Sequence, residues 1–222
     1  MYKDNSKVIL TYFNFRGRGE CIRLLLEDAG IEYEYEGIPS LDYWVKNEKP
    51  NRDKYPFCQL PVVSIDGKIL AQQDAILRTF ARAKGYYGEN DEEKSKIDMM
   101  AGGIEDLRIQ YSNLIYSPEF EAKKDKFMAK WVDRWLFCVN KLLSENNVGQ
   151  YYLVGKKISF VDFTMFEMLN LLTYLKDSCL EKYPLLQAYM KRIYERPNIK
   201  KYLESDRRFK KVNANDNGAD PN

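Results

Sequence analysis

The chain has 222 residues, of which 45% are hydrophobic and 14% aromatic, so it is long enough to bury one large core or two smaller ones. Its 35 basic and 33 acidic residues are well mixed and give a net charge of +2, which argues against binding to nucleic acid or to a membrane surface. No apolar run approaches the ~20 residues that cross a bilayer, and the first residues lack the apolar stretch of a signal peptide, so we expect a cytoplasmic protein.

The first part of the chain alternates strand and helix signals. Residues 7–12 are β-branched and apolar, which predicts a buried strand. Apolar side chains at helical spacing follow over residues 21–29, and Gly30 is placed to end that helix. Residues 31–37 predict a second strand. Strand, helix and strand within about thirty residues indicate a right-handed βαβ unit.

A second group of elements follows an irregular stretch. Residues 38–58 are polar with scattered aromatics, and they predict a loop containing a single helical turn. Residues 62–65 predict a short strand, and Asp66-Gly67 is a strong signal for a hairpin turn. A helix is then expected over residues 72–84, so the order of elements is βαβ followed by ββα.

The second half of the chain has a helical character. No strand alternation follows the Gly-containing stretch at residues 85–91, which predicts a linker. Ser159 and Asp162 match a capping box, which predicts the start of a buried helix that runs to about residue 176. The other helices are expected at residues 92–117, 119–145, 184–194 and 198–204.

These elements divide the chain into two domains. We expect an α/β domain over residues 1–84 and an all-helical domain over residues 91–205. Residues 206–222 are charged and then rich in Asn, Asp and Gly, so we expect a loosely ordered tail there.

The amino-acid inventory limits which chemistry the chain can perform. It contains no histidine, which excludes a histidine general base, a Ser-His-Asp triad and a histidine-ligated zinc site. Its four cysteines are widely spaced and form no Cys-x-x-Cys pair, so we expect reduced thiols rather than disulfides. Catalysis must therefore use tyrosine, lysine, arginine, cysteine or carboxylate groups.

Three places in the first domain are candidates for a ligand site. Tyr12 ends the first strand, and ligands of α/β domains gather beyond the carboxyl ends of strands. Pro61 begins a strand, where an X-Pro bond can expose backbone groups to a peptide-like ligand. Gln72 and Gln73 open a helix, whose free N–H groups suit a carboxylate. Each place also has an ordinary structural explanation: a core tyrosine, a strand-start proline and a polar helix cap.

Many short motifs occur in order along the chain. In the first part they are Tyr12-Phe13, Arg16-Gly17-Arg18, Trp44, Gln59-Leu60-Pro61, Asp66-Gly67 and Gln72. In the second part they include Gly103-Ile104-Glu105-Asp106-Leu107-Arg108, Leu114-Ile115-Tyr116, Ile158-Ser159-Phe160-Val161-Asp162 and Tyr183-Pro184-Leu185-Leu186. These motifs, over about residues 7–205, resemble the tyrosine-type cytosolic glutathione transferases, and the second part looks most like the pi class.

The resemblance carries expectations about fold and activity. It implies a thioredoxin-like N-terminal domain, an all-α C-terminal domain and a cis bond between Leu60 and Pro61. It implies an enzyme that joins the thiol of glutathione to small hydrophobic electrophiles, with the same thiolate also able to reduce organic hydroperoxides. Glutathione would be a co-substrate, and no other cofactor or metal is expected.

The resemblance also assigns roles to residues. Tyr12 would donate a hydrogen bond to the glutathione sulfur and favour the nucleophilic thiolate, while Arg18 would add positive charge and order the site. The remaining glutathione contacts would come from Phe13, Trp44, Lys49, Gln59, Leu60, Pro61, Gln72, Gln73 and, from a partner subunit, Asp106. The acceptor pocket would be lined by Phe13, Phe15, Tyr111 and Tyr116.

The sequence departs from the family pattern in two places. Gln73 stands where the family usually has Ser or Thr, whose small hydroxyl binds the γ-glutamyl carboxylate, so a longer amide side chain puts glutathione affinity in question. The loop before Gln59 is slightly longer than in relatives, so either Lys49 or Arg52 would be the basic contact to the glycyl end.

Phe57 bears on assembly. It stands where the pi class has an aromatic side chain that inserts into the partner subunit, which implies a homodimer. The alternative is that Phe57 packs on its own domain, as most aromatic side chains do.

Two other functions remain compatible with the same motifs. One is a non-catalytic relative that keeps the fold as a ligand-binding or structural protein, which the departure at Gln73 favours. The other is a glutathione-dependent isomerase of the prostaglandin-synthase kind, which would share the thiol site and differ in its acceptor pocket.

Overall fold

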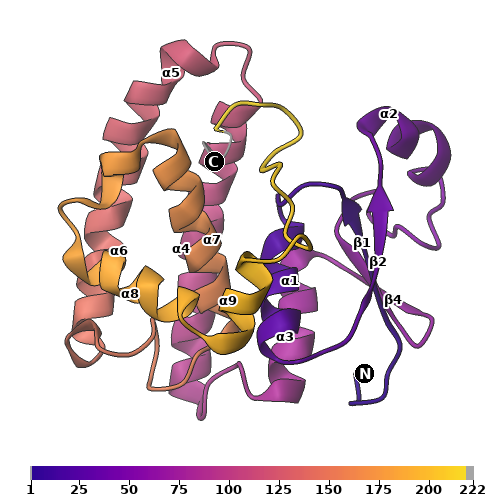
Figure 1. The fold of residues 1–222 in the computed structure, drawn as a ribbon, viewed down its shortest axis with the longest axis horizontal. Helices are drawn as coiled ribbons and strands as arrows, with labels where there is room; N and C mark the ends of the chain where they lie inside the picture. The colour runs from indigo at the N-terminus through magenta and orange to yellow at the C-terminus, as the bar shows by residue number, and fades with distance from the viewer. Residues whose placement is uncertain (1, 219–222) are drawn as a thin grey trace.

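The computed structural model describes residues 2–218, which form an α/β domain and a helical domain packed side by side (Figure 1). The α/β domain contains a four-stranded sheet in the order β2-β1-β3-β4. Its elements are β1 (Val8–Phe13), α1 (Gly19–Asp28), β2 (Glu34–Ile38), β3 (Val62–Ile65), β4 (Lys68–Ala71) and α3 (Gln73–Lys84). Within the described residues, no helix is both long and apolar enough to cross a membrane.

The strand pairing confirms the predicted βαβ and ββα order. β1 pairs in parallel with β2 and antiparallel with β3, and β3 and β4 form the predicted hairpin. At the hairpin turn Asp66 and Gly67 have φ values of 51° and 80°, and such a pair of positive φ values is what tight two-residue hairpins require. Gly30 also has the positive φ, 63°, that ends a helix in the left-handed region.

The segment between β2 and β3 is more ordered than the predicted loop. It contains the short helix α2 (Leu41–Tyr43), capped by Ser40, and a π-helical turn over Trp44–Glu48. Trp44 and Tyr55 are buried against each other, with ring centroids 4.6 Å apart. They join Ile38 and Val62 in a small second core, so aromatic burial holds this polar segment in place.

In the second domain all regular elements among the described residues are helical, as predicted. The run expected at residues 119–145 is one continuous path in which a π-helical turn separates two α-helices. The elements are α4 (Asp91–Ile115), α5 (Phe120–Phe127), the π turn (Met128–Val132), α6 (Asp133–Glu145), α7 (Phe160–Leu175), α8 (Pro184–Tyr194), α9 (Pro197–Leu203) and short 3-10 turns at Asn147–Gly149 and Asp177–Leu180.

The start of α7 shows why its sequence signal was strong. The Asp162 carboxylate accepts hydrogen bonds from the Ser159 N–H and hydroxyl, the Leu153 N–H and the Tyr189 hydroxyl, at 2.8 to 2.9 Å. Ser159 and Asp162 form the predicted capping box, and Asp162 is fully buried. One local motif therefore also ties the preceding loop and α8 to α7.

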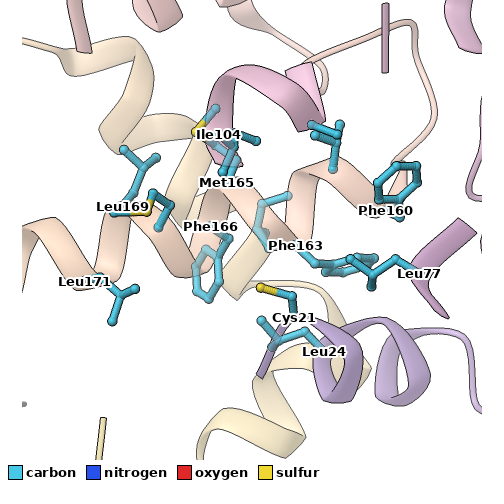
Figure 2. Packing of buried hydrophobic residues seen from close by; sticks show 14 of the residues in the cluster. Cys21, Leu24, Leu77, Ile104, Phe160, Phe163, Met165, Phe166, Leu169 and Leu171 are labelled. Atoms are coloured by element: carbon cyan, nitrogen blue, oxygen red, sulfur yellow. The ribbon is translucent and has the colours of Figure 1, made fainter. Parts of the chain in front are cut away.

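The two domains share one hydrophobic core. Both α1 and α3 contact α7, which is buried on nearly all sides. Figure 2 shows Cys21 and Leu24 of α1 close to Phe163 and Phe166 of α7. The β1–α1 connection also contacts the helical domain, because Arg16 donates a hydrogen bond to Tyr174 and Arg18 donates one to Glu105.

The expectation of a loosely ordered tail is wrong for residues 206–218. Val212 and Asn213 are 2% and 5% exposed, and Asn213 donates a hydrogen bond to the Tyr111 hydroxyl. The ring of Phe209 packs on Tyr35 and on the guanidinium of Arg23. A polar composition predicted disorder, but these long-range contacts hold the segment in place. Residues 219–222 lie outside the described residues.

Candidate active site

Tyr12 lies at the carboxyl end of β1, one residue before the strand ends. Its side chain is 6% exposed, and its ring makes edge-on contacts with Phe13 and Phe15. The backbone N–H of Arg18 donates a hydrogen bond of 3.0 Å to the Tyr12 hydroxyl. Gly17 approaches so closely that a Cβ there would lie 2.5 Å from the Tyr12 oxygen. The β1–α1 loop therefore fixes the position of this hydroxyl.

The surroundings of Tyr12 keep the phenol protonated. Burial raises the pKa of Tyr12 above its usual value of 10.0, and the N–H of Arg18 opposes this only in part. Because the Arg18 N–H occupies an acceptor position on the oxygen, the phenolic hydrogen is available for a separate bond. Among the described residues the Tyr12 hydroxyl donates no hydrogen bond of its own. It is thus a neutral donor ready to bind an anion.

Arg18 connects the loop to the helical domain. Its guanidinium forms a two-pronged ion pair with Glu105 of α4, with N–O distances of 2.8 and 2.6 Å. Paired arginine and carboxylate groups in this geometry are directional and strong. From the sequence we expected Arg18 to add positive charge to the site and to order it. Because Glu105 neutralises the guanidinium, the ion pair favours the ordering role.

A cavity of about 550 Å³ opens beside this ion pair. It brings together eight of the residues predicted to contact glutathione: Phe13, Arg18, Trp44, Gln59, Leu60, Pro61, Gln72 and Gln73. Leu41, Cys58, Asp74 and Glu105 also line it, and sequence reasoning did not single them out for this site. The Leu60–Pro61 bond is cis, as predicted.

The first residues of α3 form one wall of this cavity. Gln72 precedes the helix with φ 72° and ψ 119°, a conformation that non-glycine residues rarely adopt and that is concentrated at ligand-binding sites. Its side-chain amide donates a hydrogen bond of 3.2 Å to the Gln59 side chain. Gln73 is 5% exposed, and its amide nitrogen lies 3.5 Å from an Asp74 carboxylate oxygen. Its buried Oε1 atom has no hydrogen-bond partner among the described residues.

A second cavity, of about 420 Å³, adjoins the first and shares Phe13 and Leu41 with it. The rings of Phe13 and Phe15 stack with centroids 5.4 Å apart and planes 5° apart. Three of the four residues predicted for the acceptor pocket, together with Tyr12, line this cavity. Its full lining is Tyr12, Phe13, Asn14, Phe15, Ile38, Pro39, Ser40, Leu41, Tyr116, Lys211 and Ala214. Tyr12 thus lines the smaller, largely apolar cavity, while Arg18, whose N–H binds its hydroxyl, lines the larger, more polar one.

Four predicted residues do not line either cavity. Tyr111 is 3% exposed and lies beneath the C-terminal segment, where Asn213 covers its hydroxyl, so its placement in the acceptor pocket was wrong. Helical spacing gives the face of a residue, but it cannot show that a distant segment covers that face. Lys49, Arg52 and Asp106 are exposed at the surface of the single chain, outside both cavities.

Sequence reasoning missed the contribution of the C-terminal segment. Lys211 and Ala214 form part of the second cavity, although a polar tail gave no signal for a site. Burial makes two of the cysteine thiols unreactive, since it raises the pKa of Cys21 to about 12 and that of Cys179 to about 11. The four cysteines are free thiols, as predicted, and no thiol takes part in the site proper except Cys58 at its rim.

Comparison with known proteins gives one consistent result. Residues 8–81 match the family model for the glutathione S-transferase N-terminal domain, and residues 105–206 match that for the C-terminal domain. The chain is 40% identical over 203 residues to glutathione S-transferase P 1 of Xenopus laevis, covering 91% of this chain and 94% of the relative. It is 39% identical over 209 residues to a glutathione S-transferase of Dirofilaria immitis, covering 94% and 97%. The solved pi-class glutathione S-transferase of Onchocerca volvulus superposes with a TM-score of 0.85 at 34% identity, covering 96% of this chain and all of that one.

The chain therefore belongs to the glutathione S-transferase family. It is a transferase that conjugates glutathione, with a thioredoxin-like domain followed by a helical domain. The similarity to the pi class inferred from the motifs is confirmed.

Proposed function

We propose that Tyr12 is the residue that activates glutathione, and that the two cavities beside it bind the two substrates of a cytoplasmic homodimeric enzyme. The observation that carries this proposal is the Tyr12 phenol, which is buried, protonated and held by the Arg18 N–H. Tyr12 lines the smaller cavity, and Arg18 lines the larger one. Calorimetric titration with glutathione and a conjugation assay with an aryl halide test it. Absence of glutathione binding would contradict it.

The reaction begins with loss of the thiol proton of glutathione to solvent. The Tyr12 hydroxyl donates a hydrogen bond to the resulting thiolate, which lowers the free energy of the anion and increases its population at neutral pH. The sulfur then uses an electron pair to form a bond to an electrophilic carbon. In a substitution the leaving group departs with the electron pair of the broken bond, and in an addition the carbanion formed takes a proton from water.

The larger cavity supplies complementary contacts for a tripeptide. The backbone of Leu60, before the cis bond, would pair with the cysteinyl part of glutathione. Gln72 and the N-terminal N–H groups of α3 would bind the γ-glutamyl carboxylate. Trp44 and Gln59 would hold the glycyl end, helped by either Lys49 or Arg52 from the exposed loop outside the cavity.

The smaller cavity favours flat, apolar acceptors. The stacked rings of Phe13 and Phe15 offer aromatic surface, and Tyr116, which is 53% exposed, stands at the opening. Small hydrophobic electrophiles fit this lining. Organic hydroperoxides are a second substrate class. The thiolate attacks the terminal peroxide oxygen and breaks the O–O bond, which gives glutathione sulfenic acid and an alcohol, and a second glutathione thiol then displaces water from the sulfenic acid to form the disulfide.

Two surface features support a homodimer. Phe57 is 63% exposed, so it does not pack on its own domain. A separate cavity of about 300 Å³ lies between α4 and α6. Met99, Met100, Leu142, Leu153 and Val154 form its apolar part, and charged and polar side chains line the rest: Asn90, Glu92, Glu93, Lys96, Glu145 and Asn146. An exposed aromatic side chain and a cavity with an apolar part on the same chain can pair with each other across a two-fold axis. Asp106, exposed on α4, would then reach the γ-glutamyl group bound by the partner.

Gln73→Ser is expected to tighten glutathione binding, by about two- to fivefold. Serine has a hydroxyl to donate to the γ-glutamyl carboxylate, and it removes the buried Oε1 atom that has no partner among the described residues. Calorimetry measures the change in Kd. Gln73→Ala is the matched control, because it gives the same space without the hydroxyl. Much weaker binding by the serine variant would show that the Gln73 amide is itself a glutathione contact.

A further inference from the structure

The C-terminal segment crosses from the helical domain back to the α/β domain. After α9, residues 205–218 run along the boundary between the domains and end beside α4, as the yellow ribbon in Figure 1 shows. Arg208 is the charged residue that this segment turns inward, with 14% of its side chain exposed. Its neighbour Arg207 points outward, with 61% exposed, and pairs with Glu27.

Arg208 enters a buried group of charges between the domains. Its Nε atom donates a hydrogen bond of 3.2 Å to Glu20 of α1, and its Nη2 atom lies 3.6 Å from a Glu167 oxygen of α7. Both carboxylates are fully buried. Burial alone would raise the pKa of Glu20, but Arg23 and Arg208 outweigh this effect and lower it. Glu20 is therefore the charged anchor for Arg208, and Glu167 is the weaker partner.

The segment beyond Arg208 bonds directly to the β1–α1 loop. The N–H groups of Arg16 and Gly17 donate hydrogen bonds of 2.9 and 3.0 Å to the carbonyl oxygens of Lys211 and Val212. The Arg16 side chain also donates from Nε to the Phe209 carbonyl, at 2.8 Å. Backbone N–H groups buried without partners are costly, so the loop depends on this segment for its conformation.

The same loop determines where the Tyr12 hydroxyl is held. Gly17, which bonds to the segment, directly precedes Arg18, whose N–H binds the Tyr12 oxygen. On its other side the loop is fixed by Arg23, which donates to the carbonyl oxygens of Phe15 and Arg16. The C-terminal segment thus supports the loop together with Arg23 and the Arg18–Glu105 ion pair, and it does so within one residue of the N–H that binds the Tyr12 hydroxyl.

We propose that Arg208 is a positioning residue for Tyr12, because it anchors the C-terminal segment that holds the Arg16–Arg18 loop and its N–H donor in place. This inference rests on the proposed role of Tyr12 in binding the thiolate. The segment already lines the acceptor cavity through Lys211 and Ala214. The proposal adds a second role, in ionisation of the glutathione thiol, and this role can be measured with glutathione bound and no acceptor present.

Arg208→Met tests the inference in the full-length protein. The readout is the ultraviolet absorbance of the thiolate of bound glutathione, followed as a function of pH without any electrophile. We expect Arg208→Met to reduce the ionised fraction at neutral pH about three- to tenfold, as weakening of a single hydrogen bond would. Arg207→Met is the matched control, since it removes an exposed arginine of the same segment, and it should leave the titration within twofold of wild type.

Two further variants separate positioning from a loss of fold. Arg208→Lys keeps a cation near Glu20 and should recover much of the ionised fraction. Val212→Asp keeps Arg208 but places a carboxylate at a position that is 2% exposed, so it should release only the last part of the segment and reproduce the Arg208→Met titration. If Arg208→Met does not fold, the Val212→Asp titration decides.

Tyr12→Phe distinguishes failure of the positioning role of Arg208 from failure of the proposed role of Tyr12. If Tyr12→Phe lowers the ionised fraction while Arg208→Met and Val212→Asp leave it within twofold of wild type, the positioning role is refuted and the role of Tyr12 stands. If Tyr12→Phe itself has no effect, the proposed function of Tyr12 fails first. A reduced fraction in all three variants, with wild-type behaviour of Arg207→Met, supports the inference.

Discussion

Tyr12→Phe should lower kcat/KM for conjugation by roughly 10- to 1000-fold, the range found when one donor to a developing or stabilised anion is removed. The phenylalanine ring keeps the edge-on contacts with Phe13 and Phe15, so the fold should survive. The N–H of Arg18 loses its acceptor, which costs about 1 kcal/mol of unfolding free energy. Steady-state kinetics with an aryl halide and thermal unfolding measure the two effects separately.

A second tyrosine gives the control for this prediction. The Tyr33 hydroxyl donates a hydrogen bond of 3.0 Å to Glu27, and the residue lies outside both cavities. Tyr33→Phe should therefore keep kcat/KM within twofold of wild type. Turnover by Tyr12→Phe within the same twofold range would show that another group activates the thiol.

Phe57→Ala should raise the dimer dissociation constant by about two orders of magnitude, because truncating a buried aromatic anchor costs roughly 2–4 kcal/mol at an interface. Light scattering and sedimentation over a range of concentrations measure this change. Val45→Ala is the matched control, since Val45 is 50% exposed in the same part of the α/β domain and outside both substrate cavities. A stable, fully active wild-type monomer at low micromolar concentration would refute the dimer and the role of Phe57.

Mixing two impaired variants tests whether the site is shared between subunits. Asp106→Ala should weaken glutathione binding and leave the dimer intact. In a mixed dimer of Asp106→Ala and Tyr12→Phe subunits, one site would combine an intact Tyr12 with an intact Asp106 from the partner. Random exchange of equal amounts should therefore restore about a quarter of wild-type activity in a two-fold symmetric assembly. No recovery would show that Asp106 acts within its own subunit or not at all.

The features predicted correctly from the sequence are those with local causes. Ser159 and Asp162 lie three residues apart, so the capping box could be recognised without knowing what surrounds it. Asp66 and Gly67 determine their own turn through their φ values. The position of Tyr12 followed from the end of one apolar strand.

The features that were missed depend on contacts between distant parts of the chain. Arg208 and Glu20 are 188 residues apart, and nothing in either local sequence indicates that they meet. Tyr111 was misplaced for the same reason. Its helical face was predicted correctly, but Asn213, which is distant in the sequence, covers its hydroxyl. Charged residues in a polar tail usually remain solvated, so composition favoured disorder where the structure has an anchored segment.

The hydrogen bonds from Arg16 and Gly17 to the C-terminal segment have a consequence for how the enzyme is made. Ribosomes synthesise a chain from its N-terminus at about 5–20 residues per second, and domains generally fold as units during synthesis. The α/β domain and most of the helical domain can therefore fold before Lys211 and Val212 emerge, and the β1–α1 loop must wait for its last two acceptors. A chain that has not yet been extended to Lys211 would contain every glutathione contact predicted above, but the N–H groups of Arg16 and Gly17 would lack their acceptors. Competence to ionise the thiol would then be acquired only after residues 211 and 212 had emerged.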